Sequence, residues 1–498
     1  MLSSLYIGAT GMKSLSDGMN VTSNNLANCS TIGFKAQMAL YSDLIYEEQA
    51  NPGEWNFNQA NSMVAVGQHG MGVRVDEIAT KFAQGGLEST NSVTDMAIIG
   101  KGYFVVQDAY GGQFYTRAGD FNTDTDGILR NPNGLSLMGY DLSNSQGGGE
   151  NASRQLEAIN IDKFKSVDAK PTTSVSITDT NLVPSSNAIE DENAPYFSML
   201  TDYDARRGSA AANYSNSQAM TLYDGEGQGH DVVIYYDGSN QTSSGSSVEF
   251  LIADTSVTPT NAGDGLLMSG ILQFDLKGQL AGIACYTPTE AGNKDLANWT
   301  TASLSENGLP QLSLNDSAVS IDFGLSSTSG SWRSTGTAAD VGTDPSKLSF
   351  MADTESANHA VTGYASSPFV SSSMQDGYCQ GTLSFYEIGS DGVISGNFSN
   401  GQNIDLWQIP LARFVSDDGL NRHGDNLFSA TSEAGQMDLG APGSENYGTV
   451  AAYKIEQSNV DVSNEMVNMI ITQRGFQSNS KVVTTSDELL KTAINLKR

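Results

Sequence analysis

A short acidic stretch is the clearest candidate for metal chemistry in this sequence. It reads NTDTDG and places Asn122, Asp124 and Asp126 at alternate positions before Gly127. This spacing matches the first half of a calcium-binding loop. The twelfth position is Asn133, however, where such a loop carries a bidentate glutamate. A hairpin turn at Asp126 and Gly127 explains the same residues, so the sequence favours a turn and predicts no metal ligand.

Histidines paired with carboxylates would be the natural carriers of acid–base catalysis. His230 stands beside Asp231, and His423 lies two residues before Asp425. No GxSxG nucleophile elbow accompanies either pair, and the chain has only 4 histidines. We therefore expect surface or loop histidines, no catalytic residue and no cofactor.

The cysteines do not suggest a covalent framework or a metal site. There are 3 of them, Cys29, Cys285 and Cys379, and they are far apart in the chain. Neither a CxxC pair nor an even number is present. The sequence therefore predicts isolated packed thiols.

Composition excludes several classes of partner. The chain has 498 residues, a length typical of about three domains. Its formal net charge of -31 comes from 25 Lys and Arg against 56 Asp and Glu. Such a surface repels phosphate backbones and anionic lipids, so we expect no nucleic-acid partner. No run approaches the ~18 apolar residues of a membrane span, and the start lacks a cleavable signal pattern, so we expect no membrane insertion.

Both ends of the chain have the apolar spacing of helices. Near the N-terminus, residues three, four or seven apart predict one stripe on a helix of about 22 residues; these are Leu5, Met12, Leu15, Met19 and Leu26. From Asp461 towards Arg498 a heptad seam is formed by Val462, Met466, Met469, Phe476, Val483, Leu490 and Ile494. Because neither amphipathic helix is stable alone in water, we expect them to pair.

The sequence between the two helices is typical of β-structure. Stretches such as GYFVVQD, VVIYYDG and GTLSFYEIGSDG alternate apolar and polar residues between turn residues. The predicted fold is therefore mainly β with α-helical termini, in which nested, discontinuous β domains stand on a paired, coiled-coil-like stem. The expected parts are a helical domain, 1–30 with 456–498; a connecting segment, 31–75 with 441–455; an inner β domain, 76–145 with 366–440; and outer β material, 146–365.

Several long motifs carry a resemblance to a known family. SLYIGATGM, NNLANCSTIGFK, the stretch Gly100 to Tyr140 and the closing helix Val460 to Leu496 resemble the bacterial flagellar rod and hook axial proteins. LYDGEGQGHDVVIYY and the stretch Ser390 to Thr431 are similar to the hook members of that family. The large central insertion, which the shorter rod members lack, also favours a hook member.

The resemblance implies a structural role rather than an enzymatic one. Members of this kind polymerise helically into a hollow curved tube, a universal joint that transmits torque from the rod to the filament. The implied partners are other copies of the chain, rod proteins, the hook cap, the hook–filament junction proteins and the flagellar type III export apparatus. The implied location is the flagellar hook, outside the cell, after export without a cleaved signal peptide.

The resemblance also assigns a task to the terminal helices, which are expected to carry self-assembly. In the N-terminal helix and its exit the expected residues are Leu5, Met12, Leu15, Met19, Asn24, Asn25, Leu26, Asn28, Gly33 and Phe34. In the C-terminal helix they are Val462, Met466, Met469, Gln473, Arg474, Phe476, Val483, Leu490 and Ile494. The apolar residues of the N-terminal helix are expected to pack on the chain's own C-terminal helix, and the asparagine amides to bond neighbouring subunits or the channel lining. Gly33 is expected to turn the chain outward, with Phe34 anchoring the exit.

Three alternatives remain open at this point. A distal rod protein or a hook-associated axial protein would share the terminal motifs. A secreted acidic β-rich adhesin, from a different class, would explain the charge and the strands but would be expected to carry an intact calcium loop.

Overall fold

The chain forms two compact units, one of which is inserted into the other in sequence. The computed structural model describes residues 2–44, 46–48, 68–142, 155–178, 180–184, 189, 191–242, 245–364 and 372–495. We call residues 1–165, 383–397 and 403–498 the terminal unit, and residues 166–382 and 398–402 the central unit. The division into four parts that the sequence suggests stays a prediction.

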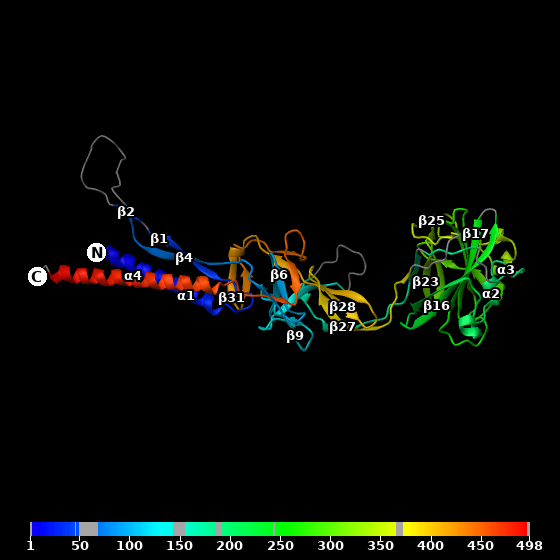
Figure 1. Cartoon of the computed structure of the whole chain (residues 1–498), viewed down its shortest axis with the longest axis horizontal. Coiled ribbons are helices and arrows are strands. Elements are labelled where there is room, and N and C mark those ends of the chain that lie inside the picture. The colour runs from blue at the N-terminus through cyan, green and yellow to red at the C-terminus, as the bar shows by residue number, and fades with distance from the viewer. Residues whose placement is uncertain are drawn as a thin grey trace, which may run out of the picture. The chain divides into compact units, whose positions relative to one another are not determined.

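Two long helices at the chain ends run side by side in the terminal unit (Figure 1). They are α1 (Leu2–Ala27) and α4 (Val462–Asn495). An antiparallel pair of strands, β1 (Gln37–Asp43) and β4 (Val73–Thr80), also contacts α1. The predicted helical termini are thus confirmed, and α1, at 26 residues, is slightly longer than expected.

The β body of the terminal unit is built on one large antiparallel sheet. Its main path follows the order β27, β28, β29, β11, β7, β8, β32, β31. These strands are β7 (Tyr103–Gln107), β8 (Gln113–Thr116), β11 (Ser136–Asp141), β27 (Gly381–Ile388), β28 (Val393–Phe398), β29 (Asn403–Gln408), β31 (Leu420–Gly424) and β32 (Leu427–Ala430). Tyr103, Tyr115, Phe414 and Phe428 form an aromatic cluster on one face of it.

Further strands are short, and some of them join the large sheet while others form separate pairs. They are β2 (Tyr46–Glu48), β3 (Gln68–Gly70), β5 (Leu87–Ser89), β6 (Met96–Ile99), β9 (Asn122–Thr123), β10 (Leu129–Arg130), β12 (Glu157–Ala158), β13 (Ser166–Val167), β30 (Leu411–Arg413), β33 (Asp438–Gly440), β34 (Thr449–Ala452) and β35 (Lys454–Glu456). Two of them bring the returning chain back to the body, since β34 pairs with β6 and β35 pairs with β5.

The stretch that imitates a calcium loop is a hairpin, as the sequence predicts. Strands β9 and β10 pair on either side of it. Gly127 has φ +78°, and its N–H donates to the carbonyl oxygen of Asp124 at 3.0 Å. The carboxylate of Asp124 lies 3.1 Å from the guanidinium of Arg130. The spacing of acidic residues therefore serves turn formation.

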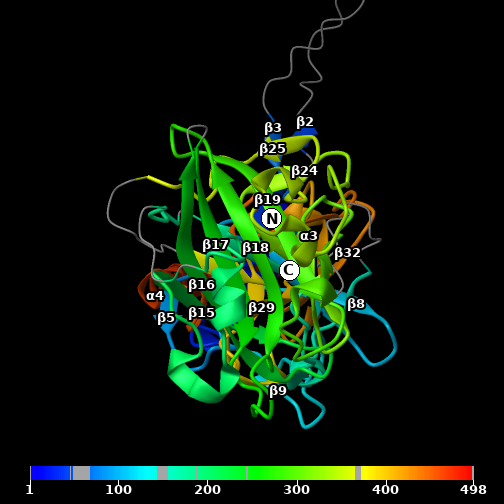
Figure 2. The ribbon, with the colours of Figure 1, turned by 90° about the vertical axis from the view of Figure 1, so that its right-hand side faces the viewer.

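Two sheets form the central unit. The larger one has the order β15, β16, β17, β18, β19, β20, and Figure 2 shows its first strands as neighbouring arrows. Its strands are β15 (Asn216–Tyr223), β16 (Gly229–Thr242), β17 (Gly245–Asp254), β18 (Leu266–Phe274), β19 (Leu280–Pro288) and β20 (Trp299–Thr301). The second has the order β21 (Ser303–Leu304), β22 (Pro310–Leu314), β23 (Ser317–Asp322), β14 (Ser174–Thr178), β26 (Ser372–Gln375). A further pair is β24 (Leu325–Ser327) with β25 (Thr354–Ser356).

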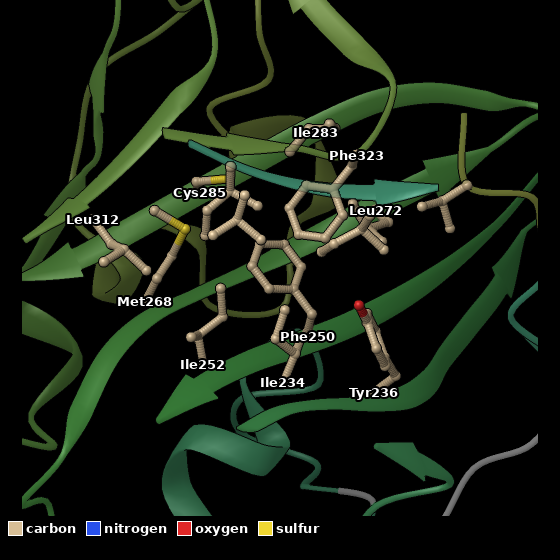
Figure 3. Close-up of a cluster of buried hydrophobic side chains, with 14 of the residues drawn as sticks. Ile234, Tyr236, Phe250, Ile252, Met268, Leu272, Ile283, Cys285, Leu312 and Phe323 are labelled. Carbon is tan, nitrogen blue, oxygen red and sulfur yellow. The ribbon is translucent and has the colours of Figure 1, made fainter. Parts of the chain in front are cut away.

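An apolar core joins the two sheets of the central unit. Phe250 from β17 and Phe323, which follows β23, lie with ring centroids 5.0 Å apart (Figure 3). Met268, Leu272 and the buried Cys285 pack into the same cluster. Alternate residues of these strands face this core, while residues between them, such as Leu251 and Ala253, pack in a second buried cluster on the other face.

Helices are few and short between the described ends of α1 and α4. The α-helices there are α2 (Ser198–Asp202) and α3 (Ala338–Val341). Short 3-10 helices lie at η2 (Asp162–Phe164), η3 (Ala205–Ala210), η4 (Leu296–Asn298), η5 (Pro345–Lys347) and η6 (Asp417–Gly419). The predicted fold class, mainly β with helical termini, is confirmed.

One buried carboxylate makes the stability of the central unit depend on pH. Glu249 on β17 is buried and accepts hydrogen bonds from the backbone N–H groups of Met199 and Leu200. Burial raises its pKa from 4.5 to about 8. The folded chain therefore holds a proton that the unfolded chain releases, so this contribution is full below pH 4.5 and is lost as the pH rises towards 8.

We predict that Glu249→Gln flattens this pH dependence. In urea unfolding of the full chain between pH 5 and 8, the parent should lose up to about 1.4 kcal/mol per pH unit relative to the variant. The variant itself should be about 1–3 kcal/mol less stable at pH 5, because its amide nitrogen faces a backbone N–H. A difference between the two chains that stays constant with pH would contradict this assignment.

Candidate assembly site

The two terminal helices approach each other closely over small residues. A Cβ placed on Gly8 would lie 2.8 Å from Cγ2 of Val483, and Gly11 is buried one turn further on. On α4, a Cβ on Gly475 would lie 3.1 Å from Cδ1 of Leu15. Gly475, which costs a helix about 1 kcal/mol of propensity, thus makes room for Leu15. At both points the helix pair therefore sets a glycine of one helix against a large apolar side chain of the other.

The large apolar residues at the start of α4 face away from this contact. We call the following residues the exposed α4 cluster, each given with its exposed fraction: Val462 40 %, Met466 52 %, Val467 54 %, Ile470 50 % and Ile471 63 %. Within the described part of α4, Ser486 is the one buried residue. The start of this helix consequently offers an uncovered apolar surface.

Part of the predicted seam is not covered within the single chain. The N-terminal stripe was expected to pack on the C-terminal helix, whereas Val462, Met466, Phe476 and Ile494 of the heptad seam are exposed. Met469, Val483 and Leu490 are half-buried, and Gln473 and Arg474 are exposed. The physical reason is that the close approach at Gly8 and Gly11 selects the face of α4 that carries Val483.

Besides α4, the helix α1 also contacts the β1–β4 pair. Ser14 Oγ donates to the carbonyl oxygen of Val73 at 3.1 Å. Asn25 Nδ2 donates to the carbonyl oxygen of Gln37 at 2.7 Å, and the Gln37 N–H donates back to Asn25 Oδ1 at 2.8 Å. Asn25 is 1 % exposed, so its amide holds the helix to β1 within the same chain.

The other predicted residues of α1 are placed differently. Asn24 is exposed and Asn28 is half-buried, and Asn28 Nδ2 donates to the carbonyl oxygen of Asn24 at 2.8 Å. The predicted apolar stripe is half-buried throughout; it consists of Leu5, Met12, Leu15, Met19 and Leu26.

The exit from α1 has the predicted geometry. Gly33 has φ +69°, and a Cβ there would lie 2.6 Å from the backbone nitrogen of Ala118, so only glycine fits. Phe34 is buried, and the guanidinium of Arg422 lies 5.0 Å from its ring centroid. Arg422 also donates to the carbonyl oxygen of Lys35 at 3.1 Å. The exit turn is therefore clamped to the β body.

A buried ionic cluster lies directly behind this turn. Lys35 Nζ lies 2.5 Å from Glu456 Oε1, and Arg117 Nη1 lies 3.4 Å from Glu456 Oε2. The backbone N–H of Gly85 donates to Glu456 Oε1 at 2.8 Å. The side chains of Lys35 and Glu456 are 1 % and 0 % exposed, and burial lowers the pKa of Lys35. We call Lys35, Arg117 and Glu456 the anchor cluster, because it ties both ends of the helical stem to the β body.

Sequence reasoning missed the anchor cluster and part of the exposed α4 cluster. Lys35 and Arg117 stand in the motifs STIGFK and TRAGDF, and each is the one basic residue of its motif. In a chain with only 25 Lys and Arg, that isolation was an available signal. The heptad positions predicted for the C-terminal helix do not include Val467, Ile470 and Ile471. These residues are apolar in the sequence, and that was a signal for an apolar surface wider than one seam.

No catalytic arrangement emerges in the part of the chain that the structure describes. There, no group of three or more His, Cys, Asp or Glu side chains is placed to hold a metal ion, and the cysteines are free. No helix of that part is long and apolar enough to cross a membrane. The expectation of surface histidines is wrong for His230, which is buried between Asp224 and Asp254 and does not pair with Asp231.

Family models match most of the chain. "Flagella basal body rod protein" matches residues 5–35, and "Flagellar hook protein FlgE/F/G D1 domain" matches residues 97–183. "Flagellar basal body protein FlaE D2 domain" matches residues 198–378, and "Flagellar basal body rod FlgEFG protein C-terminal" matches residues 452–496. The terminal matches coincide with α1 and its exit and with α4.

Whole-length relatives agree with these matches. The flagellar hook protein FlgE of Borreliella burgdorferi is 30 % identical over 505 residues, covering 100 % of both chains. The FlgE proteins of Escherichia coli and Salmonella typhimurium are each 29 % identical, over 98 % of both chains. A crystal structure of Helicobacter pylori flagellar hook protein FlgE2 is similar with a TM-score of 0.49 and 16 % identity, over 74 % of this chain and 100 % of that one. By its full-length similarity to curated relatives, this chain belongs to the flagellar hook proteins and is a structural subunit of the bacterial flagellar hook.

Proposed function

We propose that copies of this chain polymerise helically into a hollow curved tube through their helical stems. The observation that carries the proposal is the exposed α4 cluster, five large apolar residues left uncovered on a single chain. Burial of such residues between subunits contributes about 25 cal/mol per Å² of apolar area removed from water. The tube would act as a universal joint that passes torque from the rod to the filament.

Further residues of the stem are proposed to take part in assembly. Asn24 is exposed near the end of α1, and Asn28, half-buried just after it, holds the Asn24 backbone through its own amide. We assign both residues to contacts with neighbouring subunits, Asn24 directly and Asn28 by fixing its position. Gln473 and Arg474 follow the exposed α4 cluster on the same helix and are exposed. Gly33 and Phe34 are assigned a supporting role, since they set the direction in which the stem leaves the β body.

The proposed partners follow from membership of the hook family. Besides other copies of itself, the chain would contact rod proteins at one end of the tube, and the hook cap and junction proteins at the other. We propose export through the flagellar type III apparatus without cleavage, to a location outside the cell. Three free cysteines support this route, because a chain without disulfides can be threaded unfolded.

Electron microscopy of the concentrated protein tests the proposal. The full chain should form curved hollow tubes, whereas a chain lacking residues 1–30 should stay unassembled because it has lost α1, the partner of α4. Straight short tubes would indicate a rod protein instead. Tubes from the truncated chain would show that the terminal helices do not drive assembly.

A further inference from the structure

Three polar side chains of the central unit form a nearly equilateral triangle. Asp224 lies in the turn between β15 and β16, His230 starts β16, and Asn315 lies in the turn between β22 and β23. Asp224 Oδ2 is 3.2 Å from His230 Nε2 and 3.1 Å from the Asn315 side-chain amide. The third side, from that amide to His230 Nε2, is 3.2 Å.

The three sides of this triangle cannot all be hydrogen bonds while Asp224 is ionised and the Asn315 NH₂ group faces it. If His230 Nε2 is protonated, its N–H bonds Asp224 but meets the Asn315 NH₂ group, which is also a donor. If Nε2 is unprotonated, it accepts from Asn315, but its lone pair then faces the Asp224 carboxylate. A cation at the centre would remove the conflict, because all three residues can offer it a lone pair once the Asn315 amide is turned to present Oδ1 in place of its NH₂ group.

The surroundings hold two of these donors in place. His230 Nδ1 lies 2.7 Å from Asp254 Oδ2, and Ser256 Oγ donates to Asp254 Oδ1 at 2.6 Å. When a histidine binds a metal through one ring nitrogen, its other ring nitrogen usually donates its N–H to a carboxylate. The other oxygen of Asp224 accepts the backbone N–H groups of Glu226 and Gln228, at 3.0 and 2.9 Å. Both donors are therefore fixed without a ligand present.

We propose that Asp224, His230 and Asn315 form a binding site for a divalent transition cation such as Zn²⁺. Tetrahedral zinc with bonds of 2.0–2.2 Å has ligand-to-ligand separations of about 3.3 Å, close to the three sides observed. A mixed nitrogen and oxygen donor set suits this class of ion. Asn315 is exposed, so the fourth position opens to solvent and a water can fill it. The third ligand is an amide, which is why no cluster of acidic, histidine and cysteine side chains marks the site.

Such an ion would join the two sheets of the central unit. Asp224 and His230 belong to the six-stranded sheet, and Asn315 belongs to a hairpin of the five-stranded sheet. A bond from each to one ion would cross-link two hairpins that otherwise meet there through hydrogen bonds. Binding of the ion to the folded chain would raise its resistance to unfolding.

Calorimetric titration of Zn²⁺ into the EDTA-treated full chain tests the site. We expect one strong site per chain, lost in His230→Gln and weakened about tenfold or more in Asn315→Gly. Asn315 has φ +43°, so glycine removes its side chain without straining the turn. Asn315→Asp should bind more tightly than the parent, because it adds a charged ligand. His359→Gln, which removes an exposed histidine 3.6 Å from Asp322, is the matched control and should bind as the parent does.

Cobalt provides a second readout that folding alone does not change. Co²⁺ in the parent should show the visible absorption of a four-coordinate site, and Asn315→Gly should weaken it while the circular dichroism stays unchanged. Zinc affinity that is the same in the parent, Asn315→Gly and Asn315→Asp would overturn the proposal. So would strong one-to-one binding that survives His230→Gln.

Discussion

Glu456→Gln is expected to lower the free energy of unfolding of the terminal unit by about 3–5 kcal/mol. The carboxylate of Glu456 is fully buried and faces both Lys35 and Arg117. Glutamine keeps the size of the side chain but removes its charge, and its NH₂ group would face a cation. Two buried cations would then lack their counter-charge, which costs far more than the loss of an exposed ion pair.

Hydrogen exchange of the full chain measures this loss locally. Amides of β6 and β35, which lie beside the anchor cluster, should lose protection by about two to three and a half powers of ten. Peptides of the central unit serve as the internal reference and should not change. Glu88→Gln is the matched control, because Glu88 bonds Gln457 at the surface of the neighbouring strand pair. If Glu456→Gln lowers the free energy of unfolding by less than about 1 kcal/mol, the anchor cluster does not hold the stem to the β body in the way proposed.

The anchor cluster also shows why part of the site was beyond sequence reasoning. Lys35 and Glu456 are 421 positions apart, and their contact depends on the return of the chain through β34 and β35. Periodicity reports which residues are apolar along one element, but it does not report which charges are buried together. The exit turn was predictable, by contrast, because a glycine at the end of an apolar helix pattern is a local signal.

The same distinction explains the outcome for the two helices. Their existence followed from apolar spacing, and so did the strands of the central unit. The choice of face on α4 did not follow, because its first turns carry apolar residues around most of the helix, among them Val467, Ile470 and Ile471. The glycines of α1 decide which face of α4 packs on α1 within the single chain. That choice is visible only when the two helices are placed side by side. His230 was misjudged for a similar reason, since its carboxylate partners are 6 and 24 positions away and not adjacent.

The anchor and the exposed α4 cluster have complementary mechanical tasks. Burial and charge fix the stem to the β body, so torque on one is passed to the other without a loose joint between them. The exposed α4 cluster lies in the first turns of α4, next to the anchored end of the stem. Assembly contacts there would be set at a defined direction relative to the β body of the same chain.

Substitution of the exposed α4 cluster is expected to abolish tube formation while leaving the single chain intact. In Ile470→Asp combined with Ile471→Asp, two residues that are 50 % and 63 % exposed become charged. The stability of the single chain should change by no more than about 1 kcal/mol, because both side chains are at least half exposed. In the tube the same positions would be buried, so each change forfeits about 1–2 kcal/mol of further apolar burial and adds an unpaired buried charge.

The measurement is the lowest protein concentration at which tubes appear by sedimentation and electron microscopy. A loss of about 3 kcal/mol per subunit or more raises that concentration at least about a hundredfold, beyond any practical range. Thr484→Asp combined with Thr485→Asp is the matched control, since it adds the same two charges at neighbouring exposed positions of α4 outside the exposed α4 cluster. That control should assemble as the parent does. If the isoleucine variant forms tubes at the parent's concentration, the exposed α4 cluster is not the assembly surface, because a charged pair cannot be buried there without cost.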